Sequence, residues 1–590
     1  MKELFYLNKY FVKYKTRFIV GILFVILTNV FKVLSPQVLG YAIDLVSENL
    51  TLTRAFSGFE LKEILTNSIY KNILIFSLVY FGIALLAGLF TFLMRQSIIV
   101  MSRLIENDLR NEIYEHYQKL DQAFYKRNNT GDLMNKATED VSKVRMYLGP
   151  AVMYSINVLM LFSFVIYSML SIDVMFTFWV LLPMPILIFC IYKVQSLINL
   201  RSRKIQERLS DLTTHAQEFY SGIRVLKSFV QEKLAINFYK EQSQNYMTES
   251  LKMARIEAFF FPLMILLIGL STVLVVYIGG IKMNEGSITP GNVLEFVFYV
   301  NMLTWPISSV GWVATIIQTA AASQKRINDF LKSEPIIKNT SNEKADFNGD
   351  LVFDNVSFTY PDTGIEAIKN LSFSIPKGEK WAIMGKTGSG KSSIAELIER
   401  LYDVSEGSIS ISGKNIKNVA LENYRENIGY VPQDVFLFSN TIANNIKFSD
   451  LNFTIEDVIT AAKKASIHDE IMKFPKQYDT LVGERGITLS GGQKQRIAMA
   501  RVLIKSPELF ILDDSLSALD TKTEKTILGN LNTSFENKTV LIITHRIPSY
   551  IKFDKILVLE NGSLSEFGTH KELIQQKKHY FSVYQKQKER

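Results

Sequence analysis

The hydrophobic positions along the chain follow two patterns that change near residue 333. Before that point, six apolar runs with few or no charged residues are each long enough, or nearly so, to cross a bilayer core of about 30 Å. Beyond residue 350, apolar positions come in short stretches typical of strands and amphipathic helices. The pattern predicts an α-helical polytopic membrane domain of six transmembrane helices, with long helical extensions, followed by an α/β domain. The apolar runs are 17–44, 72–94, 146–172, 174–192, 258–281 and 296–324.

Two other interpretations of the apolar runs fit the sequence less well. The basic and aromatic segment 1–17, followed by an apolar run, could be a secretory signal, but no small-residue cleavage site follows it and further spans do. Six runs of this length are also not expected as buried helices of a soluble protein. We therefore expect residues 1–17 to lie at the membrane interface and to lead into the first span.

The connections between the spans differ in basic residues, and this difference predicts their orientation. Residues 101–145 hold eight Lys or Arg and residues 195–255 hold ten, whereas residues 45–70 hold only Arg54 and Lys62. Basic residues accumulate in cytoplasmic loops. The two basic connections are therefore expected in the cytoplasm, together with both termini and the C-terminal domain.

Both basic connections continue the helical periodicity of the spans that they join. Each contains one break, at 124–132 and at 217–225, where glycine or asparagine supplies a turn. A short transverse helix at each break is one interpretation, and a plain solvated loop is the other.

Composition narrows the remaining possibilities. The single cysteine, Cys190, excludes an intrachain disulfide framework and a multi-cysteine metal site. The net charge of +9 is explained by membrane topology rather than by nucleic-acid binding. The polar segment 333–350, with its proline and glycine, is typical of a linker. The predicted division is thus a transmembrane domain at 1–332, the linker at 333–350 and the α/β domain at 351–590.

A glycine-rich loop between an apolar strand and a helix carries the strongest chemical pattern. Gly385, Gly390, Lys391 and Ser392 fill the pattern G-x-x-x-x-G-K-[ST]. The glycines let backbone N–H groups point at an anion, and the helix dipole favours the same position. Lys391 can reach the β- and γ-phosphates of a nucleoside triphosphate, and Ser392 can hold Mg²⁺. The residues expected to bind the nucleotide here are Gly385, Lys386, Thr387, Gly388, Ser389, Gly390, Lys391, Ser392 and Ser393.

Further candidate residues flank this loop in the sequence. Tyr360 ends a strand ahead of the loop and offers an aromatic face for a purine ring. Gln433 follows a strand, and its amide oxygen could ligate Mg²⁺ or a water. In the stretch LSGGQKQR, Ser490 can cap the following helix. Gly491 and Gly492 let backbone N–H groups approach a second anion at that helix N-terminus.

Two carboxylates and one histidine complete the set. Asp513 and Asp514 end an apolar strand; Asp513 is the expected Mg²⁺ partner, and Asp514 lies next to the expected position of an attacking water. His545 ends another strand and could contact a γ-phosphate. Each residue alone is a weak signal, whereas the ordered set is highly specific.

This ordered set, with the six spans, resembles an ATP-binding-cassette exporter half-transporter over essentially the whole chain. The resemblance implies that ATP and Mg²⁺ are bound, with Ser392, Gln433 and Asp513 at the metal and Asp514, His545 and Gln433 as catalytic residues. It implies that the transverse segments are coupling helices and that 483–486 contacts them. It implies that Tyr360 stacks on adenine, Gln433 is the Q-loop glutamine, Leu489 to Gln493 form the signature motif, Asp513 is the Walker B aspartate, 517–520 lie in the D-loop and His545 is the switch histidine.

One position departs from the family pattern. Members that hydrolyse ATP well usually have glutamate after the Walker B aspartate, and this chain has Asp514. Its carboxylate is one methylene shorter, and positioning errors of about 1 Å change rates by about 10²-fold. The sequence DDSLSALD resembles the hydrolytically impaired subunit of bacterial heterodimeric multidrug exporters. The expected partner is a second half-transporter with glutamate at that position; a homodimer with two weak sites is the alternative.

The resemblance predicts ATP-driven export of amphipathic or hydrophobic compounds, such as drugs, lipids or peptides, across a bacterial cytoplasmic membrane. The expected partners are the lipid bilayer, the second half-transporter and a small amphipathic substrate, and no nucleic acid. A nucleotide-gated channel or regulator would carry the same motifs and is the alternative function. Glu295, near the outer end of the sixth span, is either a functional group within the membrane or a side chain that snorkels to the interface.

Overall fold

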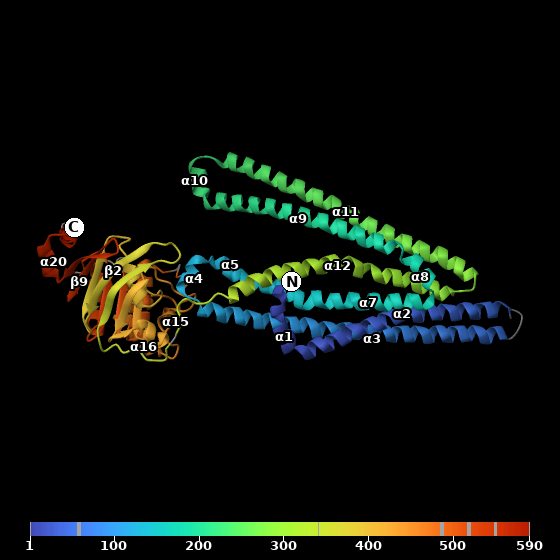
Figure 1. Ribbon diagram of the computed structural model, residues 1–590, viewed down its shortest axis with the longest axis horizontal. Helices are drawn as coiled ribbons and strands as arrows, with labels where there is room; N and C mark the ends of the chain where they lie inside the picture. The colour runs from blue at the N-terminus through green and yellow to red at the C-terminus, as the bar shows by residue number, and fades with distance from the viewer. Residues whose placement is uncertain are drawn as a thin grey trace. The chain divides into compact units, whose positions relative to one another are not determined.

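The computed structural model describes residues 2–55, 61–339, 341–483, 486, 489–515, 521–547 and 551–588, which form two compact units (Figure 1). One unit comprises Met1–His116 and Gly131–Ser333, and the other comprises Tyr117–Thr130 and Glu334–Arg590. The short segment Tyr117–Thr130 thus packs with the C-terminal half of the chain. The boundaries 1–332, 333–350 and 351–590 as functional domains stay a prediction.

The first unit consists of long helices, six of which are long and apolar enough to cross a membrane within the described residues. This confirms the predicted polytopic helical fold. The helices extend well beyond the apolar runs because their polar ends keep helical periodicity. The first two spans are α2 (Lys15–Ala55) and α3 (Leu61–Lys119), and the third is formed by α5 (Thr130–Asn135), α6 (Val141–Met146) and α7 (Val152–Ile172). The fourth is formed by α8 (Val174–Leu181) and α9 (Pro183–Ser221), and the fifth and sixth are α11 (Glu232–Asn284) and α12 (Pro290–Leu331).

Prolines mark irregular turns in two of the spans. The fourth span divides into α8 and α9 because Pro183 has no backbone N–H to continue the helical bonding. In the third span, a π-helical turn at Tyr147–Ala151 contains Pro150. A second π-helical turn covers Lys136–Asp140. The third and fourth spans meet at Asp173, whose side chain accepts a hydrogen bond from the N–H of Phe176 at 2.7 Å and so begins α8.

The N-terminal segment folds as a 3₁₀ helix, Lys2–Leu7, and a short helix α1, Asn8–Lys13. It is tied to the polar end of α3. The Oη of Tyr10 donates to Glu112 at 2.5 Å, and the Lys9 Nζ lies 2.6 Å from the same carboxylate. Lys13 pairs with Asp108 at 2.6 Å. These contacts hold the basic segment against a helical extension rather than leaving it free.

Both basic connections contain a short helix, with bounds that differ from the breaks in the sequence. The helix α4 spans Gln122–Arg127 and begins earlier than expected because the side chain of Asp121 caps it by accepting from the N–H of Phe124 at 3.1 Å. The helix α10 spans Ile223–Ser228 and begins later, because Gly222 ends α9. The alternative of plain solvated loops is therefore wrong for both segments.

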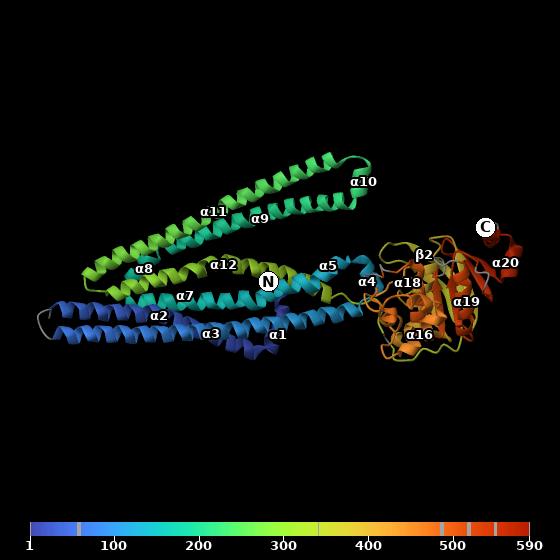
Figure 2. The same ribbon diagram turned by 180° about the vertical axis from the view of Figure 1, so that it is seen from behind.

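The second unit is an α/β domain with two sheets (Figures 1 and 2). Strands β3, β6, β7, β8 and β9 are parallel, and β10 is antiparallel to β9. The six-stranded sheet has the order β10-β9-β3-β8-β7-β6, with bounds Ser563–Gly568, Lys555–Glu560, Lys380–Gly385, Thr539–Ile543, Leu509–Asp513 and Ile428–Val431; the antiparallel sheet has the order β2-β1-β4-β5, with bounds Glu366–Ile375, Leu351–Thr359, Glu406–Ile411 and Lys414–Asn415.

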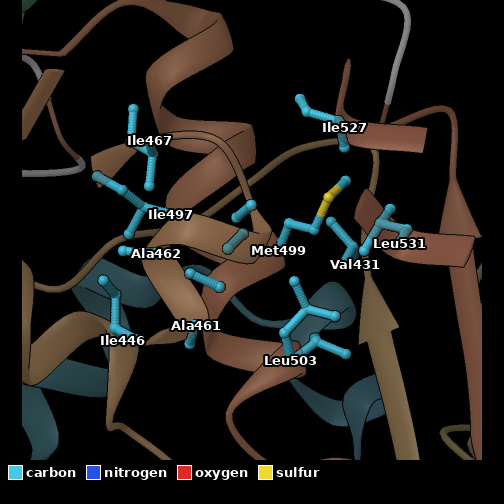
Figure 3. Packing of buried hydrophobic residues seen from close by; sticks show 14 of the residues in the cluster. Val431, Ile446, Ala461, Ala462, Ile467, Ile497, Met499, Leu503, Ile527 and Leu531 are labelled. Carbon is cyan, nitrogen blue, oxygen red and sulfur yellow. The ribbon is translucent and has the colours of Figure 1, made fainter. Parts of the chain in front are cut away.

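Two helices that begin at glycine-rich segments pack against this unit's core. The helix α13 covers Lys391–Ile398, and α18 covers Gly491–Leu503. Figure 3 shows Ile497, Met499 and Leu503 of α18 within an apolar cluster. Burying such side chains contributes about 1.5–3 kcal/mol each, which fixes the helix axis and hence the position of its N-terminus.

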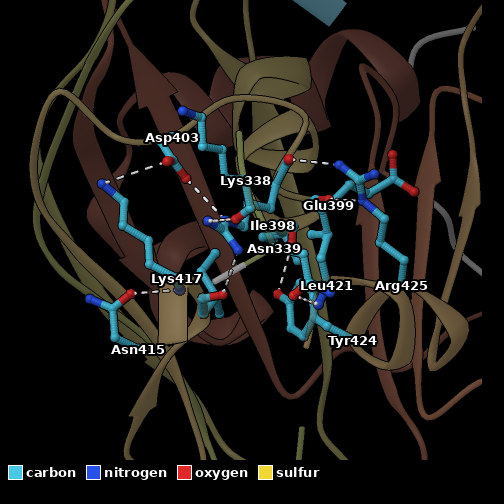
Figure 4. A network of polar contacts seen from close by, with 12 residues as sticks. Lys338, Asn339, Ile398, Glu399, Asp403, Asn415, Lys417, Leu421, Tyr424 and Arg425 are labelled. Carbon is cyan, nitrogen blue, oxygen red and sulfur yellow. Dashed lines mark hydrogen bonds and ion pairs between the residues drawn. The ribbon is translucent and has the colours of Figure 1, made fainter. Parts of the chain in front are cut away.

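A polar network holds the other end of α13 (Figure 4). The Tyr424 Oη donates to the carbonyl of Ile398 at 2.7 Å, and the Arg425 Nε donates to the carbonyl of Glu399 at 3.0 Å. Burial raises the pKa of the Glu399 carboxyl to about 7, against the lowering effect of Arg425 and Lys505. The last carbonyls of α13 are thus satisfied by side chains, and the helix is fixed at both ends.

Candidate nucleotide-binding site

The loop between β3 and α13 has the backbone that its glycines predict. Gly388 and Gly390 have φ values of +81° and +95°, in the region where side chains are strained. A Cβ at Gly390 would lie 2.4 Å from the carbonyl oxygen of Ala367. Only glycine fits this position, because the neighbouring strand approaches too closely for any side chain.

Lys391 begins α13 and turns back into the loop. Its Nζ donates to the carbonyl oxygens of Gly385 at 3.0 Å and Lys386 at 2.8 Å. Burial lowers the pKa of the Lys391 ammonium group, while the carboxylates of Asp513 and Asp514 raise it. The ammonium group is therefore partly desolvated and positioned inside the loop, where it can meet phosphate oxygens.

The two carboxylates lie at the end of β7. Asp513 is buried, and burial raises the pKa of its carboxyl. A hydrogen bond with Ser392 lowers that pKa, and the neighbouring Asp514 raises it. Asp514 follows with a φ of +44°, and its N–H donates to the carbonyl of Ile543 at 2.9 Å. Aspartate tolerates this left-handed conformation better than most residues.

One cavity of about 530 Å³ brings most of the predicted residues together. Parallel strands place their carboxyl ends at one edge of the sheet, and for this reason residues far apart in sequence meet there. Among the described residues, the predicted residues on the cavity wall are Tyr360, Thr387, Gly388, Gly390, Lys391, Ser392, Ser393, Gln433, Asp513, Asp514 and His545. The lining also includes residues that sequence reasoning missed, among them Lys369, Asn561 and Gly562.

Three predicted residues of the loop lie outside the cavity wall. The carbonyl oxygens of Gly385 and Lys386 face the Lys391 ammonium group. The Nζ of Lys386 lies 3.7 Å from Glu560, and its side chain is exposed. Ser389 is buried. Their direct contact with a nucleotide stays a prediction.

The second glycine-rich segment is built as a helix N-terminus. Ser490 caps α18 by accepting from the N–H of Gln493 at 3.3 Å, and the Gln493 side chain accepts from the N–H of Ser490 at 2.9 Å. Glu470 fixes this end, since it accepts from Gln493 at 2.9 Å and from Arg496 at 2.6 Å. Within the described part of the chain, Ser490, Gly491, Gly492 and Gln493 do not line the phosphate-loop cavity.

The comparisons with known proteins cover nearly the whole chain. The family description "ABC transporter transmembrane region" matches residues 18–307, and "ABC transporter" matches residues 368–517. The chain belongs to the ABC transporter family. The probable multidrug resistance ABC transporter ATP-binding/permease protein YheI of Bacillus subtilis is 32% identical, over 98% of this chain and 97% of YheI. The multidrug resistance-like ATP-binding protein MdlA of Escherichia coli is 32% identical, over 98% of this chain and 96% of MdlA.

A solved structure agrees with this assignment. A bacterial Atm1-family ABC exporter with ATP bound matches with a TM-score of 0.78 and 25% identity, over 97% of this chain and 98% of that chain. The predicted resemblance is thus confirmed, apart from the impaired site. The chain is a multi-pass membrane protein that binds ATP and is an ATPase coupled to transport.

Tyr360 of the transporter is held from two sides. Its Oη lies 2.8 Å from the Ser393 Oγ and donates to Glu396 at 2.7 Å. The rings of Phe358 and Tyr402 pack edge-on against it, with centroids 4.8 and 5.4 Å away. The ring that is predicted to stack on adenine is therefore tied directly to the phosphate-loop helix.

Lys126 of α4 is a contact that sequence reasoning missed. Within the second unit, its Nζ lies 5.0 Å from the centroid of the Tyr360 ring and 3.4 Å from Glu396. Ala123 of the same short helix is buried in this unit's core. No motif marks Lys126, because its position depends on the packing of α4 and not on a local pattern.

The contacts of Tyr360 predict different effects for two substitutions. Tyr360→Ala removes the stacking face and should weaken ATP binding by about fivefold or more. Tyr360→Phe keeps the ring and removes only the hydroxyl contacts, so a smaller loss is expected. Titration with a fluorescent ATP analogue measures both. Equal losses in the two variants would show that the hydroxyl, and not the ring, matters.

Proposed function

We propose that the transporter exports amphipathic or hydrophobic compounds across the cytoplasmic membrane, with both termini and the nucleotide-binding domain in the cytoplasm. The observation that carries this proposal is the phosphate-loop cavity in one chain with six apolar helices. The basic connections 101–145 and 195–255 support the orientation. The names of YheI and MdlA refer to multidrug resistance, which supports an amphipathic cargo.

A reconstitution experiment tests export against the channel alternative. The transporter and its partner are placed in sealed vesicles, and ATP is added on the side of the nucleotide-binding domain. Export predicts accumulation of a fluorescent amphiphile against its gradient, with sensitivity to vanadate. Nucleotide-dependent conductance without accumulation would instead support the channel.

We propose that Ser392, Asp513 and Gln433 hold Mg²⁺ with the nucleotide. All three side chains supply oxygen donors, the kind that Mg²⁺ prefers, and all three line the same cavity. The raised pKa of buried Asp513, beside a second carboxylate, fits a position that a cation would stabilise. When bound, Mg²⁺ would neutralise charge on the β- and γ-phosphates.

The transporter is further proposed to work with a second chain. Its signature residues, which the family resemblance places at an ATP phosphate, do not line its own phosphate-loop cavity within the described residues. A second chain would supply the missing signature to this cavity. It would also use this chain's Ser490 and Gly492 at a cavity of its own.

The two short transverse helices support the same proposal. The helix α4 buries Ala123 within its own chain. In contrast, α10 has no buried side chain, and Val225 and the following Phe229 are 61% and 71% exposed. An exposed apolar surface at a helical tip is typical of a docking site. The nucleotide-binding domain of the second chain is the proposed acceptor.

Asp514 supports a heterodimer in which this chain's own site hydrolyses ATP poorly. Its short carboxylate lines the cavity beside Asp513, where efficient family members usually carry glutamate. A partner with glutamate at that position would provide the productive site. Residues 517–520, which are expected in the D-loop, lie outside the described residues, as do residues 484–485 of the segment that is expected to contact the coupling helices.

Gly222→Pro tests the proposed role of α10. The N–H of Gly222 donates to the carbonyl of Glu218 at 2.8 Å, and proline would remove this bond and shift α10. Transport per ATP hydrolysed should fall severalfold. Gly222→Ala is the matched control, because the φ of −90° suits alanine. An unchanged ratio of transport to ATPase activity in the proline variant would contradict docking by α10.

A further inference from the structure

A second cavity, of about 580 Å³, lies in the first unit between α7, α9 and α12. Its volume is within the range of about 300–1,000 Å³ that drug-sized ligands occupy. None of the nucleotide-site residues lines it. Neither the family match nor the names of the relatives assign a ligand to it.

One end of this cavity is polar without being charged. On α9 the lining includes the carboxamides of Gln195 and Asn199 and the hydroxyl of Ser196. On α12 it includes the hydroxyl of Thr315 and the carboxamide of Gln318. Each carboxamide can donate two hydrogen bonds and accept two. This end can therefore bind a ligand group that both donates and accepts.

The opposite end of the cavity is apolar. Ile188 and Ile191 precede the polar residues on α9, and Ile307 precedes them on α12. Because α9 and α12 run in the same direction, both helices change from apolar to polar toward the same end (Figures 1 and 2). A molecule that matches this cavity has a hydrocarbon part and a polar head.

The carboxamides have room and bonding capacity for such a head. A Cβ at Gly311 would lie 3.2 Å from the Cγ of Gln195, so glycine gives this side chain its space. The Gln195 Nε2 donates to the Asn199 Oδ1 at 3.4 Å, which is long for such a bond. A ligand amide or hydroxyl could therefore compete well for these groups.

Charge distinguishes this cavity from another in the same unit. Its lining has no Asp, Glu, Lys or Arg among the described residues. A cavity at the N-terminal end of α12 is instead lined by Asp44 and by buried Glu295. The side chains of Asn199 and Gln318 are exposed, so a head group that binds there keeps part of its water. The lining offers hydrogen bonds to an uncharged head and no carboxylate to attract a cationic one.

We propose that the cavity between α7, α9 and α12 binds the cargo as an uncharged amphiphile, with an amide or hydroxyl head on Gln195, Asn199 and Gln318. The hydrocarbon part lies along Ile188 and Ile307. That the bound molecule is the cargo rests on the proposed export function. The binding itself needs neither nucleotide nor turnover, so it can be tested separately.

The test uses two photoreactive probes of equal length in the assembled transporter. Both carry an alkyl diazirine; one ends in a carboxamide and the other in a trimethylammonium group. The protein is held without nucleotide in nanodiscs of phosphatidylcholine, which is zwitterionic with no net charge, and labelled peptides are mapped by mass spectrometry. The carboxamide probe should label α9 and α12 peptides that line the cavity at least about fivefold more than the cationic probe does, because a trimethylammonium group forms no hydrogen bonds with the carboxamides.

Matched variants test the carboxamides directly. The double change Gln195→Leu with Gln318→Leu should lower labelling by the carboxamide probe about tenfold, since two hydrogen-bonding groups are lost. Gln206→Leu is the control, because Gln206 is exposed on α9 and outside the cavity. On the unmodified protein, octanamide should compete with the probe better than octyltrimethylammonium does, which keeps the test valid if the double variant folds poorly.

Several results would overturn the proposal. Equal or stronger labelling by the cationic probe, better competition by octyltrimethylammonium, or full labelling of a folded double variant would each do so. Loss of ATP-driven export with intact labelling would refute the proposed function and leave the binding site standing. Intact export with no labelling of the cavity would refute the site alone.

Discussion

Lys391→Ala is expected to lower ATP binding at this chain's own site by about 10- to 100-fold, because a hydrogen bond between two charged groups is lost. The Lys391 side chain is already held in the loop, because its Nζ donates to two loop carbonyl oxygens at 3.0 and 2.8 Å. Little conformational entropy is therefore spent when phosphate binds. Photolabelling of this chain with an azido-ATP, after separation from the proposed partner, measures the effect.

Two further variants separate charge from packing. Lys391→Met keeps the length of the side chain and removes its charge, so it should lose as much binding as the alanine variant. Lys377→Ala is the control. This exposed lysine does not line the cavity, and its Nζ donates to the Asn348 Oδ1 at 2.5 Å. Unchanged labelling of Lys391→Ala would refute the assignment of the phosphate loop.

The fold could be predicted from the sequence wherever one dominant physical constraint applies. Apolar runs of sufficient length must be helical in a bilayer, because no water satisfies the backbone there. The six spans follow from that rule. The ends of the helices do not follow from that rule. The helix α3 continues to Lys119 through polar residues, and the start of α4 depends on the cap at Asp121. Such limits depend on side-chain contacts with no periodic signal.

The candidate site shows the same division. The phosphate loop is contiguous, so Gly390, Lys391 and Ser392 could be identified by spacing alone. Asp513 and His545 could be added because parallel strands end at a common edge. The contact of Lys126 with the Tyr360 ring was not predictable, because α4 folds onto the other end of the chain. The uncharged cavity could not be predicted either, because its lining comes from three separate helices.

Gly492→Asp is expected to abolish most ATP turnover of the assembled transporter, by about 10²-fold, whereas Asp514→Asn should change it by less than about twofold. The added carboxylate would repel phosphate at the N-terminus of α18, where the partner's nucleotide is proposed to bind. Asp514→Asn alters only the site that is proposed to hydrolyse poorly. Steady-state ATPase assays on the purified transporter, assembled with its proposed partner, compare the two variants.

Photolabelling distinguishes a loss of ATP turnover at the proposed partner's site from misfolding of the variant. Because Gly492 does not line this chain's own cavity among the described residues, azido-ATP should still label this chain in Gly492→Asp. Asp514→Glu lengthens the carboxylate by one methylene and should raise turnover at this site, provided that the left-handed backbone at φ +44° accepts it. If this chain alone forms a dimer with full substrate-stimulated turnover, and Asp514→Asn abolishes it, then Asp514 is the working base and the asymmetric heterodimer is wrong.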